Sequence, residues 1–266
     1  MMDMVFGQVG RWAVIVSPAS TLLHNQRLWA EWESWMTRPL LFVMSLLLAC
    51  PGISASEVEP AAATRTIVLV RHGHYAPDPA ADAKLGPALT SLGIAQAHLV
   101  GARLAGLPEK FDTVYASPML RADQTAKVIV GDLDGAAIQT LADLAECTPP
   151  TRRKEITAAM KPEELVDCAN QFDRLFAERF KPASGAPRQE LMVCHGNVIR
   201  YLITKSLGVD TEAWLEMSVG HVSMTTIRIE ADGSMKLIAA GDVGHVPPNL
   251  RTGATGDPER MLTVAD

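Results

Sequence analysis

The chain has 266 residues, of which 48% are hydrophobic and 20% charged, with a formal net charge of −6 and a pI of about 5.7. No acidic or basic block dominates, and this argues against a nucleic-acid-binding surface. The composition fits one globular domain of about 200 residues together with an additional segment.

The additional segment is N-terminal. Residues 36–55 contain one basic residue, Arg38, then an apolar run from Leu40 to Cys50, then small residues. This layout is typical of a secretory signal peptide, and the run is shorter than the roughly 20 residues that span a bilayer. We expect cleavage after Ala55, with a lipoprotein signal ending at Cys50 as the alternative. Both predict an exported, periplasmic protein, and only lipidation at Cys50 would bring it to a membrane.

Residues 1–35 precede this signal, although a signal peptide normally begins close to its methionine. They are interpreted as a mis-called start, with the true start at Met36, or as a genuine upstream extension. Residues 56–65 read as a linker, 66–245 as the folded domain and 246–266 as an irregular tail rich in Pro and Gly.

Within the domain, apolar β-branched runs alternate with longer amphipathic segments. Strands are expected at 66–70, 113–116 and 188–194, with a weaker strand and turn at 136–146 and a hairpin at 222–241. Helices are expected at 91–107, at 121–131 ending at Gly131, at 161–180 and at 198–207. Such alternation predicts a three-layer αβα sandwich around a mostly parallel, mixed sheet, with function at the carboxyl ends of the strands.

Three predicted strands end in cationic or imidazole side chains. Arg71 and His72 follow the first, Arg121 lies just beyond the second, and His195 follows the third. Guanidinium groups donate paired hydrogen bonds to phosphate oxygens, and a helix starting at Asn197 would add free N–H groups. If these groups meet, they form a pocket for a dense anion without a metal ion.

Five segments in this order resemble the histidine phosphatase superfamily, also called phosphoglycerate-mutase-like. They are VRHGHY (70–75), LTSLGIAQA (89–97), SPMLRADQTA (117–126), LAE (144–146) and VCHGNVIR (193–200). The resemblance implies a metal-independent phosphomonoester hydrolase that needs no cofactor. It implies that His72 accepts the phosphoryl group, that Arg71, Arg121 and His195 hold it, and that Glu146 donates the proton.

The branch and the substrate are less clear from the sequence. Tyr75 and the ending GDVGHVPP (241–248) resemble the mitochondrial protein serine/threonine phosphatases of this family. A phosphoglycerate-type mutase and a non-catalytic phosphate-binding module remain alternatives. The substrate is expected to be a phosphorylated small molecule or a phosphoprotein, and the oligomeric state is open.

Residues at the rim of the predicted pocket are His74, Asn197 and His221, although His221 is as well explained as a core histidine. The basic triplet 152–154 is read either as a solvated loop or as an attractor of anionic substrate. After cleavage, Cys147, Cys168 and Cys194 remain. Nothing in their spacing selects a disulfide pair.

Overall fold

The computed structural model describes residues 60–133 and 136–253, all within one unit of the chain, Val58–Asp266. The expected segments 1–35 and 36–55, with the cleavage position at Ala55 and the lipidation position at Cys50, lie outside the described residues. In the part of the chain that is described, no helix is both long and apolar enough to cross a membrane.

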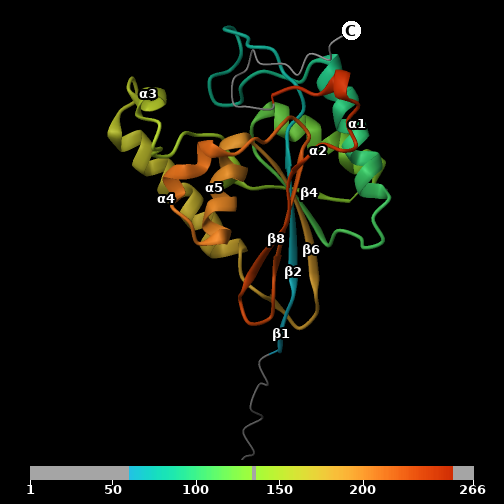
Figure 1. The fold of residues 1–266 in the computed structure, drawn as a ribbon. Helices are drawn as coiled ribbons and strands as arrows, with labels where there is room; N and C mark the ends of the chain where they lie inside the picture. The colour runs from blue at the N-terminus through green and yellow to red at the C-terminus, as the bar shows by residue number, and fades with distance from the viewer. Residues whose placement is uncertain (1–59, 134–135, 254–266) are drawn as a thin grey trace, which may run out of the picture. The chain divides into compact units, whose positions relative to one another are not determined.

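A six-stranded sheet forms the centre of the domain (Figure 1). Its strands lie in the order β4-β3-β6-β2-β7-β8. The first four run parallel, whereas β7 pairs antiparallel with β2 and β8 antiparallel with β7. The predicted mixed, mostly parallel sheet is confirmed. The strands are β2 (Arg65–Arg71), β3 (Thr113–Ala116), β4 (Ile138–Thr140), β6 (Arg188–Cys194), β7 (Met224–Ile229) and β8 (Met235–Asp242).

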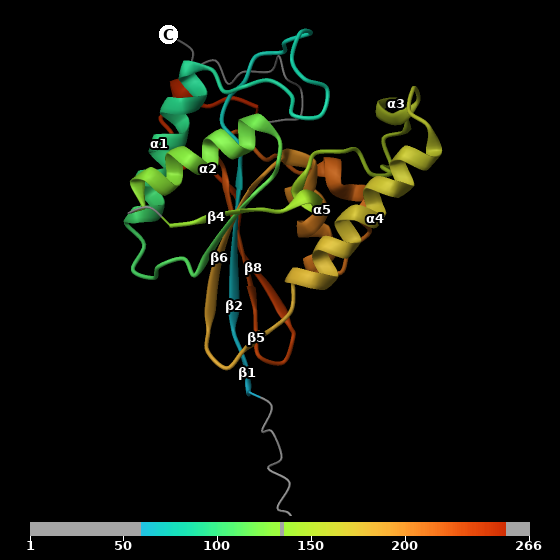
Figure 2. The same cartoon turned by 180° about the vertical axis from the view of Figure 1, so that it is seen from behind.

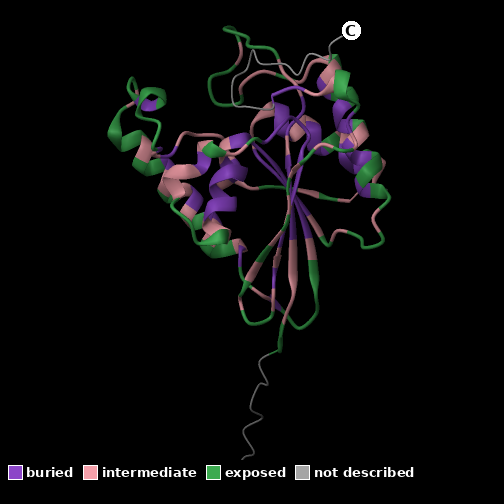
Figure 3. Cartoon of the chain, viewed as in Figure 1, coloured by how far each residue is buried: buried purple, intermediate pink, exposed green. Residues whose placement is uncertain are grey.

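Strand β2 is apolar from Ile67 to Val70 because both of its faces are covered there. Successive side chains of a strand point to opposite sides, so Ile67 and Leu69 enter one core cluster while Val68 and Val70 enter the other. All four are buried, and Figure 3 shows that burial is concentrated in the part of the sheet that lies between the helices. Full burial of such a side chain stabilises the fold by about 1.5–3 kcal/mol. The two cores therefore hold the end of β2 rigidly.

Helices cover both faces of the sheet (Figures 1 and 2). On one face lie α1 (Ser91–Ala105) and α2 (Leu120–Asp132), and on the other α4 (Pro162–Arg179) and α5 (Gly196–Leu207). Thr90 caps α1 as expected, since its hydroxyl oxygen accepts a hydrogen bond from the Gly93 N–H at 3.2 Å. The three-layer αβα sandwich is confirmed.

Helix ends differ from the prediction at one glycine. Gly131 was expected to end α2, but the helix continues through Asp132 and reaches its C-cap at Leu133. Gly208 does end α5, because its φ of 65° is the left-handed conformation that glycine adopts without strain. A glycine therefore stops a helix only where the backbone turns left-handed, and spacing alone does not reveal this.

Short elements complete the domain. A two-stranded antiparallel sheet joins β1 (Ala62–Ala63) to β5 (Ala183–Ser184), so part of the expected linker is paired. The others are α3 (Lys154–Thr157) and three 3₁₀ helices: η1 (Ala142–Leu144), η2 (Thr211–Glu216) and η3 (Pro248–Leu250).

The start of the expected irregular tail packs onto the domain. Val246 and Thr252 are buried. The Gln96 side chain of α1 donates hydrogen bonds to the Leu250 carbonyl at 2.6 Å and to the Thr252 hydroxyl at 2.9 Å. The folded region therefore extends beyond the predicted end at residue 245, to at least residue 253.

Candidate active site

The site lies where β2 and β6 end side by side. Arg71 pairs with Cys194 in parallel register, and the His72 N–H donates to the Cys194 carbonyl at 2.9 Å. His72 and His195 therefore leave the sheet at the same level, with ring centroids 5.0 Å apart. The helices that follow these two strands, α1 and α5, lie on opposite faces, so this edge is the switch point at which open α/β sheets bind ligands.

The ring of His72 is buried and fixed in one tautomer. Its Nδ1 lies 2.8 Å from the Gly73 carbonyl oxygen, which can only accept, so Nδ1 carries the hydrogen. Nε2 is left with a lone pair and accepts a hydrogen bond from Arg121 Nε at 3.1 Å. Burial, and then the neighbouring His195, lower the pKa of His72 well below its ordinary 6.5. The imidazole is therefore neutral at physiological pH.

Arg121 lies in the first turn of α2, which places its guanidinium over the site. It is buried and lies over the Tyr75 ring at 4.8 Å from guanidinium carbon to ring centroid. Such a cation–π contact uses the face of the guanidinium and leaves its in-plane N–H groups for hydrogen bonds. Burial lowers the pKa of Arg121 below its ordinary value.

Arg71 is held at the floor of the site. One of its terminal nitrogens donates to the Val219 carbonyl at 2.6 Å and to the Gly253 carbonyl at 2.7 Å. Its Nε is buried and has no hydrogen-bond partner among the described residues. Burial lowers its pKa to about 10, so the group stays charged at neutral pH.

His195 is buried at the tip of β6. Its Nε2 lies 2.8 Å from the Ser117 hydroxyl at the end of β3. Its Nδ1 is buried without a partner in the described part of the chain. Burial, and then Arg121, lower the pKa of His195 well below 6.5. This neutral ring can therefore offer one N–H to an anion when Ser117 donates to the other nitrogen.

Glu146 follows η1 and meets the N-terminus of α5. Its Oε1 accepts from the Asn197 backbone N–H at 3.3 Å, and its Oε2 is buried without a partner within the described ranges. Burial raises its pKa from 4.5 to about 7, against Arg71, which acts in the opposite direction. The carboxyl is therefore partly protonated near neutral pH, as a general acid requires.

The rim residues take three different places. His221 lies in the site, with its ring centroid 5.3 Å from that of His72 and its Nδ1 2.7 Å from the Thr252 hydroxyl. Burial lowers its pKa to about 2, so it is neutral. Asn197 contacts Glu146, whereas the His74 Nδ1 lies 2.8 Å from the Thr90 hydroxyl at the start of α1.

Two contributors were missed by sequence reasoning. Arg200, on the first turns of α5, is buried. Its guanidinium and that of Arg71 both lie beside Gly196, since a Cβ added to this glycine would be 3.6 Å from Arg200 and 3.5 Å from Arg71 Nε. Thr125 accepts a hydrogen bond from the Gly73 N–H at 3.0 Å. Arg200 stands in a segment that the sequence analysis had singled out, but only the turn of α5 brings it toward Arg71.

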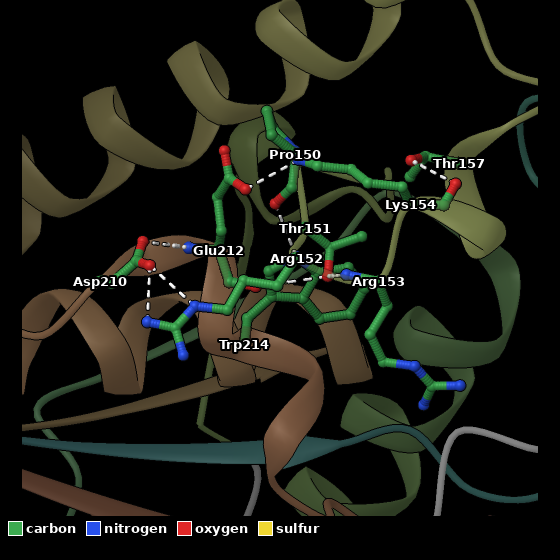
Figure 4. A network of polar contacts seen from close by, with 9 residues as sticks. All are labelled: Pro150, Thr151, Arg152, Arg153, Lys154, Thr157, Asp210, Glu212 and Trp214. Atoms are coloured by element: carbon green, nitrogen blue, oxygen red, sulfur yellow. Dashed lines mark hydrogen bonds and ion pairs between the residues drawn. The ribbon is translucent and has the colours of Figure 1, made fainter.

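The basic triplet spans the end of a loop and the first residue of α3, and it is ion-paired (Figure 4). Arg152 pairs with Asp210 at 2.7 Å, and Lys154 with Glu212 at 2.9 Å. The middle residue of the triplet, Arg153, pairs at 2.9 Å with Glu155, two residues further along the chain. Acidic partners already balance all three charges, and this favours the solvated-loop interpretation over attraction of an anionic substrate.

One cysteine pair is bonded next to the site. Cys147, directly after Glu146, forms a disulfide with Cys168 of α4, while Cys194 is free and buried. Burial raises the pKa of Cys194 well above its ordinary value, so it is an inert thiol.

Comparison with known proteins identifies relatives of this arrangement. Residues 67–240 match the histidine phosphatase superfamily (branch 1). The chain is 37% identical over 199 residues to the Caenorhabditis elegans protein named serine/threonine-protein phosphatase Pgam5, mitochondrial, covering 73% of this chain and 68% of that one. It is 32% identical to the Mus musculus protein of the same name, covering 72% and 67%.

Solved structures agree on the fold. A putative alpha-ribazole-5'-P phosphatase from Escherichia coli aligns with a TM-score of 0.54 at 20% identity, covering 68% of this chain and 98% of that one.

The predicted location is wrong. The curated relatives are named as mitochondrial, which contradicts an exported, periplasmic protein. A short apolar run after a basic residue shows only that a segment can enter an apolar environment. It does not show which membrane receives it.

Proposed function

Because the chain belongs to the histidine phosphatase superfamily and is a histidine-type phosphatase, we propose that it hydrolyses phosphoserine and phosphothreonine esters of proteins through a phosphohistidine at His72. The observation that carries this is the fixed tautomer of His72, which leaves Nε2 with a lone pair that accepts a hydrogen bond from Arg121. The names of the curated relatives support the substrate class. They also support a mitochondrial location, which fractionation of the source cells would test.

The first step transfers the phosphoryl group to His72. Its Nε2 attacks phosphorus while the bond to the serine or threonine oxygen breaks, and Glu146 gives its proton to that oxygen. An alkoxide is a very poor leaving group, so proton donation is essential for these substrates. The Nδ1 hydrogen bond to the Gly73 carbonyl stabilises the imidazole as positive charge develops on it.

Cationic and neutral donors balance the charge of the phosphoryl oxygens. Arg121 exchanges its hydrogen bond to His72 for bonds to the phosphoryl group, and Arg71 offers its unpartnered Nε. His195 donates from Nδ1, while the Ser117 hydroxyl donates to Nε2 and fixes the ring. Donors placed in advance stabilise such a transition state, which makes little demand on covalent activation.

The second step returns His72 to its neutral form. Glu146, now a carboxylate, removes a proton from water as the water oxygen attacks phosphorus, and the N–P bond breaks. Inorganic phosphate leaves, and Glu146 is again protonated. Since the pKa of Glu146 is about 7, both its forms are accessible near neutral pH, as this alternation requires.

The test measures phosphate release by the full chain from phosphoserine, phosphothreonine and phosphotyrosine peptides, and isomerisation of phosphoglycerate. We expect His72→Ala to lose at least 10³-fold in kcat on the first two peptides, since it removes the nucleophile. Exposed His98 on α1 supplies the matched control, His98→Ala, which should retain activity. Equal turnover by wild type and His72→Ala would refute the mechanism, and isomerisation faster than hydrolysis would favour a mutase.

A further inference from the structure

The segment that carries Glu146 is clamped to α4. The Gln171 side chain of α4 donates hydrogen bonds to the Asp143 carbonyl at 3.1 Å and to the Ala145 carbonyl at 2.9 Å. These bonds hold the main chain up to the residue before Glu146. They do not fix the main chain after Glu146, which other contacts must hold.

Beyond Glu146, the chain is fixed at Cys147. The Asn197 side chain of α5 donates to the Cys147 carbonyl at 3.0 Å. The Cys147 side chain is bonded to Cys168, which is buried in α4. We call residues 143–147, which carry Glu146, the acid segment. This disulfide is the one covalent cross-link between the acid segment and α4 in the described part of the chain.

The carboxyl group of Glu146 makes few contacts that would fix its position. Its Oε1 accepts one hydrogen bond, at 3.3 Å, and its Oε2 has no partner among the described residues. Its position therefore depends on the main chain on either side. We propose that the Cys147–Cys168 disulfide is a positioning element for Glu146, so that its reduction by a dithiol impairs proton donation to the leaving group. This inference rests on the proposed role of Glu146.

Reduction is chemically simple and reversible. Cys147 is half-buried whereas Cys168 is buried, so Cys147 sulfur is the accessible point of attack. A dithiol thiolate attacks that sulfur, the Cys147–Cys168 bond breaks, and Cys168 leaves as a thiolate that takes up a proton. The second thiol of the reductant then displaces Cys147. The protein gains two electrons and two protons, and the reductant becomes a cyclic disulfide.

Comparing two leaving groups distinguishes a displaced Glu146 from a general loss of structure. Displacement of p-nitrophenolate needs no proton donor, whereas displacement of a serine alkoxide does. Small displacements of a catalytic group cost up to about 10²-fold in rate. We expect reduction to slow phosphorylation of His72 by a phosphoserine peptide at least tenfold. With p-nitrophenyl phosphate as the substrate, the rate of the pre-steady-state burst of p-nitrophenolate should change less than twofold.

The experiment compares oxidised and dithiothreitol-reduced full chain, both carrying Cys50→Ser so that the thiol of Cys50 cannot take part in the exchange. Mass spectrometry after alkylation confirms that Cys147 and Cys168 are the residues modified. The double variant Cys147→Ser/Cys168→Ser should resemble the reduced protein and be indifferent to dithiothreitol. Reoxidation of the reduced protein should restore the peptide rate. Because this protein folds before it is reduced, the test does not depend on folding of the variant.

Two results would overturn the inference: an unchanged peptide rate on reduction, or equal losses with both substrates. Neither would affect the proposed function, which fails if His72→Ala keeps its activity or if isomerisation of phosphoglycerate is faster than hydrolysis.

Discussion

Replacing Glu146 by Gln should stabilise the protein at neutral pH while it removes the proposed proton donor. Burial raises the pKa of Glu146 from its ordinary 4.5 to about 7. At about 1.4 kcal/mol per pKa unit, this difference between the unfolded and folded pKa corresponds to at most about 3 kcal/mol in the free energy of unfolding. Solvent screening reduces the value, because the residue is only half-buried. That is a large share of the 5–15 kcal/mol typical of a domain, so the effect is measurable.

The sign follows from which state binds the proton. Below pH 4.5 both folded and unfolded chains hold it, and above pH 7 both have lost it. Between these values the folded chain keeps a proton that the unfolded chain releases, so this contribution to stability is lost as pH rises. Gln does not titrate. The stability of Glu146→Gln relative to wild type should therefore increase from pH 4.5 to pH 7 and then stay level.

Denaturant unfolding at pH 5, 6, 7 and 8 measures this difference. Asp82 supplies the control, because the backbone N–H groups of Leu85 and Lys84 lower its pKa below 3.8. Asp82→Asn should thus differ from wild type by a constant amount from pH 5 to pH 8. A constant difference for Glu146→Gln over the same range would show that the carboxyl is not held protonated by burial. Loss of phosphoserine hydrolysis by about 10²–10⁴-fold should accompany the gain in stability.

Four further substitutions test the site and its support. Arg121→Lys should lower kcat/KM for a phosphoserine peptide by about 10²-fold, since an ammonium group cannot reproduce the fixed fork of the guanidinium; wild-type kinetics would contradict its role. Gly93→Ala should reduce the free energy of unfolding by about 2 kcal/mol or more, because its Cβ would lie 2.1 Å from the His74 carbonyl oxygen. In the same denaturation assay Gly131→Ala, with open space around it, should gain about 0.5–1 kcal/mol. Arg200→Met should move the alkaline limb of the pH–rate profile upward, since this guanidinium lowers the pKa of the proposed acid; a downward move would refute the coupling.

The local sequence pattern was sufficient to predict the layered architecture and the residues at the ends of the strands. The alternation of short β-branched runs with amphipathic segments predicted the αβα sandwich, because each element must bury its apolar surface against another. Arg71, His72 and His195 could be placed together for the same reason, since parallel strands present their carboxyl ends at one edge. Glu146 needed the family resemblance, because a loop carboxylate has no periodic signal.

Other features depended on contacts that a linear reading cannot supply. The pairing of Cys147 with Cys168, and not with Cys194, follows from α4 packing beside the acid segment. The packing of residues 246–253 onto α1 and Arg71 involves a Pro- and Gly-rich stretch with no periodic pattern.

By itself, then, the amino-acid sequence determined the layered architecture and the identity of the cationic and imidazole groups at the strand ends, because burial and strand direction are local consequences of residue order. Tertiary structure alone decided the protonation of the groups. The neutral His72 and the raised pKa of Glu146 both arise from burial beside residues distant in the chain. Such desolvation is a property of the assembled site and not of any segment.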